Sequence, residues 1–261
     1  MEAEKQSRLT DYPSPIGYEP AKKIIEQMEK YICKIFVGKD QQGTGFFCKI
    51  PLTDINVTLN VLITNNHIIN NKSLYNKDLK ISLYIEEIMK IKIIDLNNRM
   101  KYTNDTYDIT IIEIKESDEI QNYLEIDDII MKEIMDSKNR NDKYIAQTIY
   151  IIQYPEGDLS VSFGVLWEIF GDKKYNFLHK CYTKKGSSGS PILNINNKVI
   201  GIHKEGMNKN LNLGAFLNFP IKEFIDQNYT NIKRTINEKN DDISLNENFS
   251  KEPNKVEKEN N

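Results

Sequence analysis

Cysteine and histidine are scarce in this sequence of 261 residues, with three of each. The cysteines are Cys33, Cys48 and Cys181; their number is odd, their spacing is wide and no Cys-x-x-Cys pair occurs. Disulfide frameworks and cysteine zinc sites depend on paired or closely spaced cysteines, so the sequence predicts neither. We expect three buried free thiols instead.

The sequence also lacks long apolar runs and a strong excess of charge of one sign. No segment approaches the ~18 apolar residues of a membrane-spanning helix, so we expect no membrane association. The first fifteen residues, MEAEKQSRLTDYPSP, have no apolar core, which argues against a secretory signal. We therefore expect a cytoplasmic protein, with secretion left open if the chain has been processed. The formal net charge is −3, and we expect no nucleic-acid partner.

Short apolar runs separated by Asn and Asp make up most of the chain. This pattern is typical of all-β sandwiches and barrels rather than of alternating strands and helices. The polar residues 136–143, DSKNRNDK, indicate a surface connection between two halves. A proline at the start of residues 20–28 and of residues 220–227 favours a short helix at each place. From about residue 237 onward, the chain has too few large apolar side chains to form a core.

One stretch, GSSGSP at residues 186–191, has the composition of a nucleophile loop. Glycines allow a tight backbone course and leave room above the loop, so a substrate carbonyl could reach both the Ser188 hydroxyl and local backbone N–H groups. These are the requirements of a serine nucleophile with an oxyanion hole. A plain glycine-rich loop leading into the hairpin of residues 192–202 is the alternative.

Two further residues complete a possible triad. His67 follows the apolar residues 61–64, and Asp108 precedes the apolar residues 109–112. The chain order His, Asp, Ser is that of the chymotrypsin-type arrangement. A capping or buried role is the alternative for His67. Asp105 competes with Asp108 for the third position, and we favour Asp108 because the strand after it would hold it rigidly.

Six motifs resemble those of the trypsin-like (chymotrypsin-fold) serine peptidases, over roughly residues 30–228. They are GTGFF (43–47), LITNNHII (62–69), YDITIIEI (107–114), YPEG (154–157), GSSGSP (186–191) and VIGIH (199–203). Within that family the V8-like glutamyl endopeptidase branch is most similar. The resemblance implies an all-β fold of two six-stranded antiparallel β-barrels with a short C-terminal helix.

The resemblance also implies roles for particular residues. His67 would be the general base, Asp108 its orienting partner and Ser188 the nucleophile, with an oxyanion hole formed by the N–H groups of Gly186 and Ser188. Proteins or peptides would be the substrates, and the chemistry would need no metal or organic cofactor. Cleavage would proceed through an acyl-enzyme.

Two more positions match the branch's pocket for an acidic substrate side chain. They are Thr183, five residues before Ser188, and His203, fifteen residues after it. A histidine and a hydroxyl beside a carboxylate would favour Glu, or Gln, before the scissile bond. His203 could instead be a satisfied interior histidine. Lys204 and Glu205 follow it, and whether they attract or repel an acidic substrate is open.

The sequence divides into five expected segments. These are an N-terminal extension with a short helix (1–30), a first barrel with His67 and Asp108 (31–125), a linker (126–142), a second barrel and closing helix with Ser188 (143–228), and a charged, unstructured tail (229–261). Two other functions compete with catalysis. The chain could be an inactive relative that binds peptides in its cleft, or a scaffold that acts through the charged tail.

Overall fold

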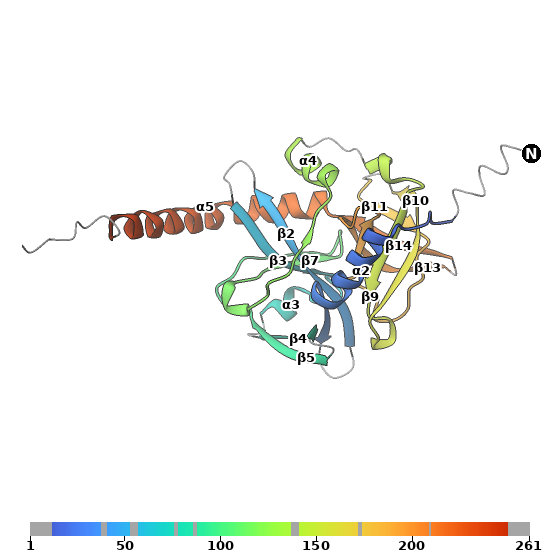
Figure 1. The fold of residues 1–261 in the computed structure, drawn as a ribbon, viewed down its shortest axis with the longest axis horizontal. Helices are drawn as coiled ribbons and strands as arrows, with labels where there is room; N and C mark the ends of the chain where they lie inside the picture. The colour runs from blue at the N-terminus through green and yellow to red at the C-terminus, as the bar shows by residue number, and fades with distance from the viewer. Residues whose placement is uncertain are drawn as a thin grey trace, which may run out of the picture. The chain divides into compact units, whose positions relative to one another are not determined.

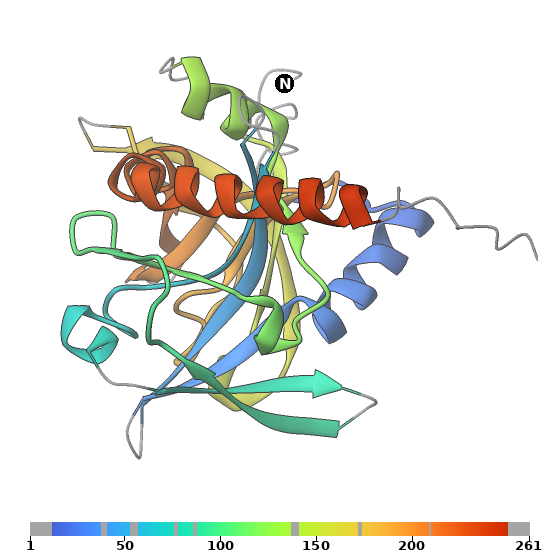
Figure 2. The same ribbon diagram turned by 90° about the vertical axis from the view of Figure 1, so that its left-hand side faces the viewer.

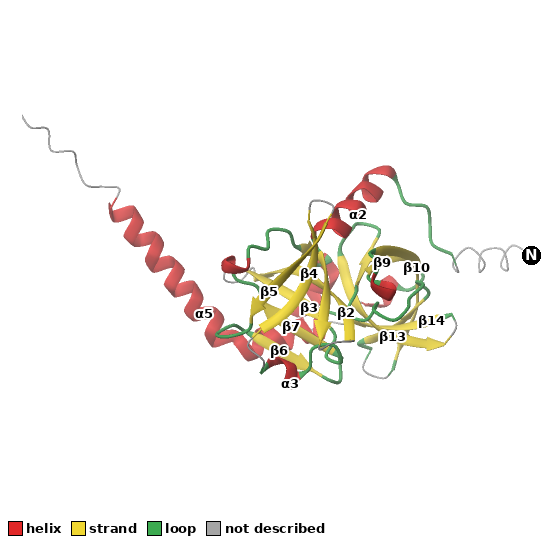
Figure 3. Cartoon of the chain, turned by 90° about the horizontal axis from the view of Figure 1, so that it is seen from below, coloured by secondary structure: helices red, strands yellow, loops and turns green. Residues whose placement is uncertain are grey.

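The computed structural model describes residues 12–37, 41–52, 57–75, 78–85, 88–136, 141–171, 174–208 and 210–249. The chain divides into two units, Met1–Phe224 and Ile225–Asn261. Two β-sheets, antiparallel except for one short parallel pair, make up most of the first unit (Figures 1 and 3). The fold class predicted from the sequence, an all-β chymotrypsin-like architecture, is confirmed.

The N-terminal sheet has eight strands, of which seven follow the order β5-β4-β1-β2-β3-β7-β6, while β8 pairs with β2 in parallel. The strand bounds are β1 Ile32–Val37, β2 Gln41–Leu52, β3 Val57–Thr64, β4 Asp78–Ile85, β5 Ile88–Asp95, β6 Lys101–Asn104, β7 Ile109–Glu113 and β8 Leu124–Glu125. The hairpin of β4 and β5 is seen from the side in Figure 2. A single turn of helix, α3 (Asn71–Leu74), follows the end of β3.

The apolar runs of the sequence supply the core of this sheet. Phe47, Leu62, Ile81 and Ile112 are completely buried in one cluster. Removing such side chains from water contributes about 1.5–3 kcal/mol each. The three cysteines are free and buried, as predicted. Burial raises the pKa of each of these thiols and keeps them protonated.

The C-terminal sheet closes into a six-stranded barrel in the order β10-β11-β14-β13-β12-β9. Its strands are β9 Thr148–Gln153, β10 Ser160–Phe170, β11 Asn176–His179, β12 Pro191–Asn194, β13 Val199–Asn208 and β14 Leu211–Phe216. All six residues of β9 are buried, which fits its continuous apolar run. The predicted hairpin after Ser188 is the pair β12 and β13.

The predicted linker, residues 126–142, contains a helix and a buried hydrogen-bond network. It carries the helix α4 (Asp128–Asp136), and Ile130 and Ile134 in that helix are buried. Asp127 accepts hydrogen bonds from the Tyr144 hydroxyl and from Asn194 Nδ2, the latter over 2.8 Å. This buried network anchors the start of α4 to the C-terminal barrel. Residues 137–140 lie outside the described part of the chain.

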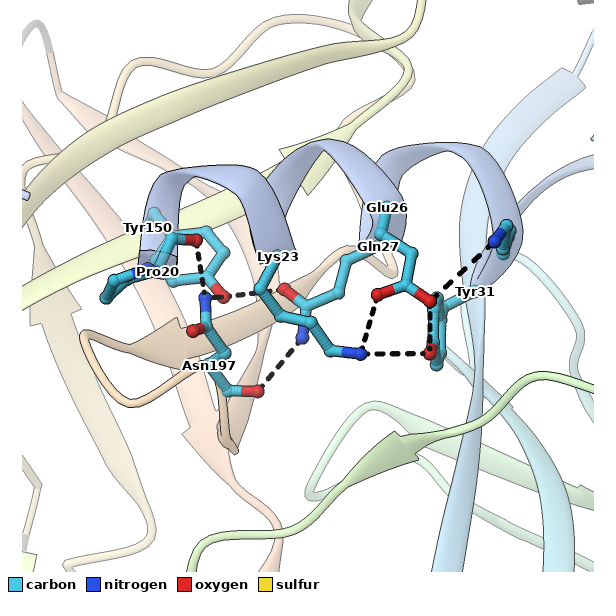
Figure 4. Close-up of polar contacts among 8 residues, drawn as sticks. Pro20, Lys23, Glu26, Gln27, Tyr31, Tyr150 and Asn197 are labelled. Carbon is cyan, nitrogen blue, oxygen red and sulfur yellow. Dashed lines mark hydrogen bonds and ion pairs between the residues drawn. The ribbon is translucent and has the colours of Figure 1, made fainter. Parts of the chain in front are cut away.

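The predicted N-terminal helix is present as α2 (Tyr18–Lys30) and docks on the second barrel. Gln27 is buried and makes two hydrogen bonds there, as Figure 4 shows: its Oε1 accepts from the Tyr150 hydroxyl (2.7 Å) and its Nε2 donates to the Asn197 carbonyl (3.0 Å). Asn197 Nδ2 in turn donates to the Pro20 carbonyl (3.3 Å). These bonds fix α2 against β9 and the β12–β13 turn.

The C-terminal helix differs from the prediction. A short helix over residues 220–227 and an unstructured tail from residue 229 were expected, whereas α5 spans Asn218–Phe249, 32 residues. The tail composition is rich in Lys, Glu and Asn, and Lys and Glu are good helix formers even without a core to pack against. Its last residues, 250–261, lie outside the described part of the chain. The beginning of α5 belongs to the first unit.

Candidate active site

His67 and Asp108 make a two-point contact. His67 lies in the turn after β3, and Asp108 lies at the end of the turn that leads into β7. Asp108 Oδ2 is 2.7 Å from His67 Nδ1, and Asp108 Oδ1 accepts the His67 backbone N–H over 2.9 Å. The carboxylate therefore fixes both the ring and the backbone of the histidine. With Nδ1–H donated to Asp108, the lone pair of the neutral ring is on Nε2.

The backbone of Asp108 is held in an uncommon conformation. Its φ is +55°, a left-handed value that few residues other than glycine adopt. The Asp108 N–H donates to the Asp105 carbonyl (3.2 Å), and the Asp108 carbonyl accepts from Asn65 Nδ2 (2.8 Å). Asn65 is buried, so the His67 turn and the Asp108 turn are locked together. Of the two carboxylates weighed from the sequence, the one that binds His67 belongs to Asp108.

Ser188 lies in the loop between β11 and β12, and two glycines shape that loop. Gly186 has φ +97° and Gly189 has φ +86°. A Cβ on Gly186 would lie 2.4 Å from the Tyr154 carbonyl oxygen, and one on Gly189 would lie 2.0 Å from the Thr44 carbonyl oxygen. Only glycine fits at either position, which is the physical reason for the GSSGSP pattern.

Thr44 of the first sheet holds this loop. Its N–H donates to the Ser188 carbonyl and its hydroxyl donates to the Gly186 carbonyl, both over 2.8 Å. The Thr44 carbonyl accepts from the hydroxyl of Thr64, the last residue of β3 and three residues before His67. These hydrogen bonds therefore connect the Ser188 loop to β3, the strand that precedes His67.

Two backbone donors of the loop point to no acceptor in the described part of the chain. Neighbouring N–H groups do have partners: Ser187 donates to the Lys184 carbonyl (3.0 Å) and Gly189 to the His203 carbonyl (3.1 Å). Among the described residues, the N–H groups of Gly186 and Ser188 donate to none. A pair of uncommitted amides beside a serine hydroxyl can receive a developing oxyanion.

Ser188 opens onto a cleft of about 820 Å³ that also contains both predicted pocket residues, Thr183 and His203. Thr183 lies in the loop between β11, which ends at His179, and Ser188. Thr183 Oγ1 donates to Asn212 Oδ1 over 2.7 Å, and Asn212 itself lines the cleft. Asn212 Nδ2 donates to the Cys181 carbonyl (2.7 Å).

His203 is 2% exposed and is backed by a second buried histidine. Its Nδ1 lies 3.1 Å from His179 Nε2. Burial is the main cause that lowers the pKa of His203 to about 3; the nearby His67 acts in the same direction and Asp108 opposes the shift. Burial also holds the pKa of His179 well below its ordinary value. Both rings are therefore neutral near pH 7.

The two charged residues after His203 lie differently. Glu205 lines the cleft, where its carboxylate adds negative charge near the pocket. Lys204 is largely buried, burial lowers its pKa, and its Nζ is 3.5 Å from Asn176 Oδ1. Glu205 therefore lines the cleft, whereas Lys204 packs in the protein interior.

Two residues of the site escaped the sequence analysis. Thr44 could have been noticed, because a hydroxyl residue between two glycines in a strand indicates close backbone contact. Asn212 gave no signal, since nothing in its local sequence places it opposite Thr183. Among the described residues, no group of three His, Cys, Asp or Glu side chains could hold a metal ion. None of the described helices is long and apolar enough to span a membrane.

Comparison with known proteins places this geometry in a family. Among curated proteins, glutamyl endopeptidases from Staphylococcus aureus strains MW2 and MSSA476 are each 34% identical over 98 residues. That stretch covers 36% of this chain but only 29% and 28% of those relatives, so the chain spans less than a third of their length.

Solved structures match over more of the chain. Deg5 has a TM-score of 0.55 at 15% identity and covers 78% of this chain and 91% of its own. The serine endoprotease from Yersinia pestis has a TM-score of 0.54 at 12% identity and covers 82% of this chain and 68% of its own. At such identities these likenesses show the fold. The family model described as a trypsin-like peptidase domain matches residues 43–202, a range that includes His67, Asp108 and Ser188. The chain belongs to the trypsin-like peptidase family.

Proposed function

We propose that the chain is a serine endopeptidase in which Ser188 is the nucleophile, His67 the general base and Asp108 the residue that orients it. The two-point contact between His67 and Asp108 carries this proposal. It leaves the Nε2 lone pair of His67 for the serine proton. It also stabilises the imidazolium that forms when the proton arrives.

The reaction follows from these positions. As the Ser188 Oγ–C bond forms, His67 Nε2 takes the hydroxyl proton and the substrate carbonyl oxygen becomes an oxyanion. The N–H groups of Gly186 and Ser188 donate to that oxyanion. His67 then gives its proton to the leaving amine as the C–N bond breaks, which yields an acyl-enzyme. Water deprotonated by His67 hydrolyses the ester and restores Ser188.

Covalent labelling with a fluorophosphonate probe tests the proposal, because the probe reacts with an activated serine whatever the substrate. The parent chain is expected to be labelled and Ser188→Ala is not. Ser117→Ala, an exposed serine in the 3-10 turn Glu116–Asp118, is the matched control and should label like the parent. Folded parent protein without Ser188-dependent labelling would favour a peptide-binding relative that has no activity.

We also propose that the substrate side chain before the scissile bond is Glu or Gln. Thr183 and His203 share the cleft of Ser188 and can both hydrogen-bond such a side chain. The 98-residue similarity to glutamyl endopeptidases supports the same assignment. A cleavage profile on an unbiased peptide mixture checks it: cuts should follow these two residues, and cuts spread over apolar positions would contradict it.

A further inference from the structure

The hydroxyl hydrogen of Thr183 is already committed within the pocket wall. Asn212 Nδ2 donates to the Cys181 carbonyl, so Asn212 must turn its Oδ1 towards Thr183. Oδ1 can only accept, and Thr183 Oγ1 therefore donates to it over 2.7 Å. A hydroxyl has a single hydrogen. Thr183 consequently presents only its oxygen lone pairs to the cleft, where it acts as a hydrogen-bond acceptor.

His203 offers the opposite polarity. His179 Nδ1 accepts the Cys181 backbone N–H (3.3 Å), so the neutral His179 ring carries its hydrogen on Nε2. That hydrogen is donated to His203 Nδ1, 3.1 Å away. The neutral His203 ring must then carry its own hydrogen on Nε2. Since His203 lines the cleft and its Nδ1 is occupied, the group that it presents is an N–H donor.

We propose that this pocket selects glutamine over glutamate, with Asn212 and His179 as the positioning residues that set its pattern of one acceptor and one donor. A carboxamide matches the pattern: its oxygen accepts from His203 Nε2–H and its NH₂ donates to Thr183 Oγ1. A carboxylate has no hydrogen for Thr183. To bind it, Thr183 would have to leave Asn212, and Asn212 Oδ1 would lose its partner. The inference rests on the peptidase function proposed above.

The charges that line the cleft agree with a neutral substrate side chain. Lys184 is paired with Glu156 over 2.7 Å, and Lys180 lies 3.2 Å from the Trp167 ring centroid. Lys185 is exposed, where water screens its charge. Glu205 lines the same cleft, and its negative charge disfavours an acidic substrate side chain. The described cleft residues thus include no buried cation that would favour glutamate over glutamine.

Two peptides that differ only in Gln or Glu before the scissile bond test the inference with the full chain at pH 7.5. We expect kcat/KM to be about ten- to a hundredfold higher for the glutamine peptide, the range set by leaving one buried polar group unpaired. Equal values, or a preference for glutamate, would overturn it. The same preparation cleaves both peptides, so the folded fraction of the protein cancels from the ratio of the two kcat/KM values.

Asn212→Leu tests the cause of the preference. Without Oδ1, the Thr183 hydroxyl is free to donate to a carboxylate, and the ratio of glutamine to glutamate cleavage should fall by about tenfold or more. Asn196→Leu, in the turn between β12 and β13, is the matched control and should keep the parent ratio. If Asn212→Leu does not fold, Thr183→Val removes the Thr183 Oγ1 that would accept from the carboxamide, with little change of shape, and should likewise lower the ratio. An unchanged ratio in these variants would also overturn the inference.

Labelling by the fluorophosphonate probe in the same preparations distinguishes a failure of the glutamine preference from a failure of the proposed peptidase function. Ser188-dependent labelling together with equal cleavage of both peptides would leave the peptidase function standing and remove the glutamine preference. Neither labelling nor cleavage would remove both.

Discussion

Asp108 combines a proposed orienting role with a left-handed backbone, and this combination makes one substitution informative. Asparagine adopts positive φ more readily than most residues, so Asp108→Asn fits the φ of +55°. The amide cannot hold the ring of His67 in the tautomer with hydrogen on Nδ1. We expect kcat to fall about 10⁴-fold with little change in the melting temperature. Rates within a few fold of the parent would transfer the role to another carboxylate, with Asp105 the first to examine.

A comparison of Gly189 with Gly171 separates the effect of backbone strain from that of a steric clash. Gly189 and Gly171 have similar φ values, +86° and +83°, so alanine meets the same backbone penalty of about 1–2 kcal/mol at both. At Gly171 the new Cβ has no atom within 4 Å, whereas at Gly189 it lies 2.0 Å from the Thr44 carbonyl oxygen. Gly189→Ala should therefore abolish probe labelling of Ser188, while Gly171→Ala should lose only stability, measured by urea unfolding. Equal labelling of the two variants would contradict the close packing of Gly189 against the Thr44 carbonyl.

At the scale of elements, the start of α5 supports the turn that carries Asp108. Glu223 accepts hydrogen bonds from Tyr102 and Tyr107, each over 2.8 Å, and from Asn104 Nδ2 over 3.2 Å. Burial, together with the Glu223 carboxylate, raises the pKa of both tyrosines. Tyr107 directly precedes Asp108, so the start of α5 affects the position of the Asp108 carboxylate.

Glu223→Gln measures this support. The single amide oxygen can still accept from Tyr102 and Asn104, but the NH₂ in the place of Oε1 can only donate to the Tyr107 hydroxyl, which must turn to accept, and all three bonds lose the negative charge of the carboxylate. The free energy of unfolding should fall by about 1–3 kcal/mol, and the rate of probe labelling should fall with it because the Asp108 turn loosens. Glu19→Gln, exposed on α2, should change neither quantity. A stability loss without any effect on labelling would confine Glu223 to a structural role.

The sequence predicted the site best where the chemistry is local. Positive φ at Gly186 and Gly189 demands glycine, and a nucleophile loop needs both, so GSSGSP carries its own physical signature. His67 and Asp108 could be found because each lies beside an apolar strand, His67 three residues after β3 and Asp108 directly before β7. Asn212 could not be found this way. Its value comes from lying opposite Thr183, a contact across 29 positions of sequence that no local pattern encodes.

For the whole molecule, the two β-rich halves were predictable from short apolar runs, but the way each sheet closes was not. The C-terminal sheet closes into the expected six-stranded barrel, whereas the N-terminal sheet is an eight-stranded arrangement with an added parallel strand, β8. Closure depends on pairings between distant strands, such as β9 with β12. The polar composition of residues 136–143 predicted a surface connection, but no local pattern indicated the buried contacts that Asp127, earlier in the linker, makes with Tyr144 and Asn194.

The buried histidine pair makes the stability of the whole fold depend on pH. Burial lowers the pKa of His203 to about 3 and holds that of His179 well below 6.5, while both rings in the unfolded chain titrate near 6.5. Below that pH the unfolded state therefore binds more protons than the folded state. The free energy of unfolding should fall as pH is lowered, by up to about 1.4 kcal/mol per pH unit for each histidine.

Urea unfolding between pH 7 and pH 5 measures this slope, because most carboxylates titrate below that range. His179→Gln can still accept from the Cys181 N–H and donate to His203 Nδ1, and it cannot be protonated in this range. It should therefore keep the fold and lose about half of the slope that comes from the buried pair, because only His203 of that pair then remains to be charged on unfolding. A variant slope as steep as that of the parent would mean that the proton uptake belongs to other groups, and that the pair is not held neutral by burial.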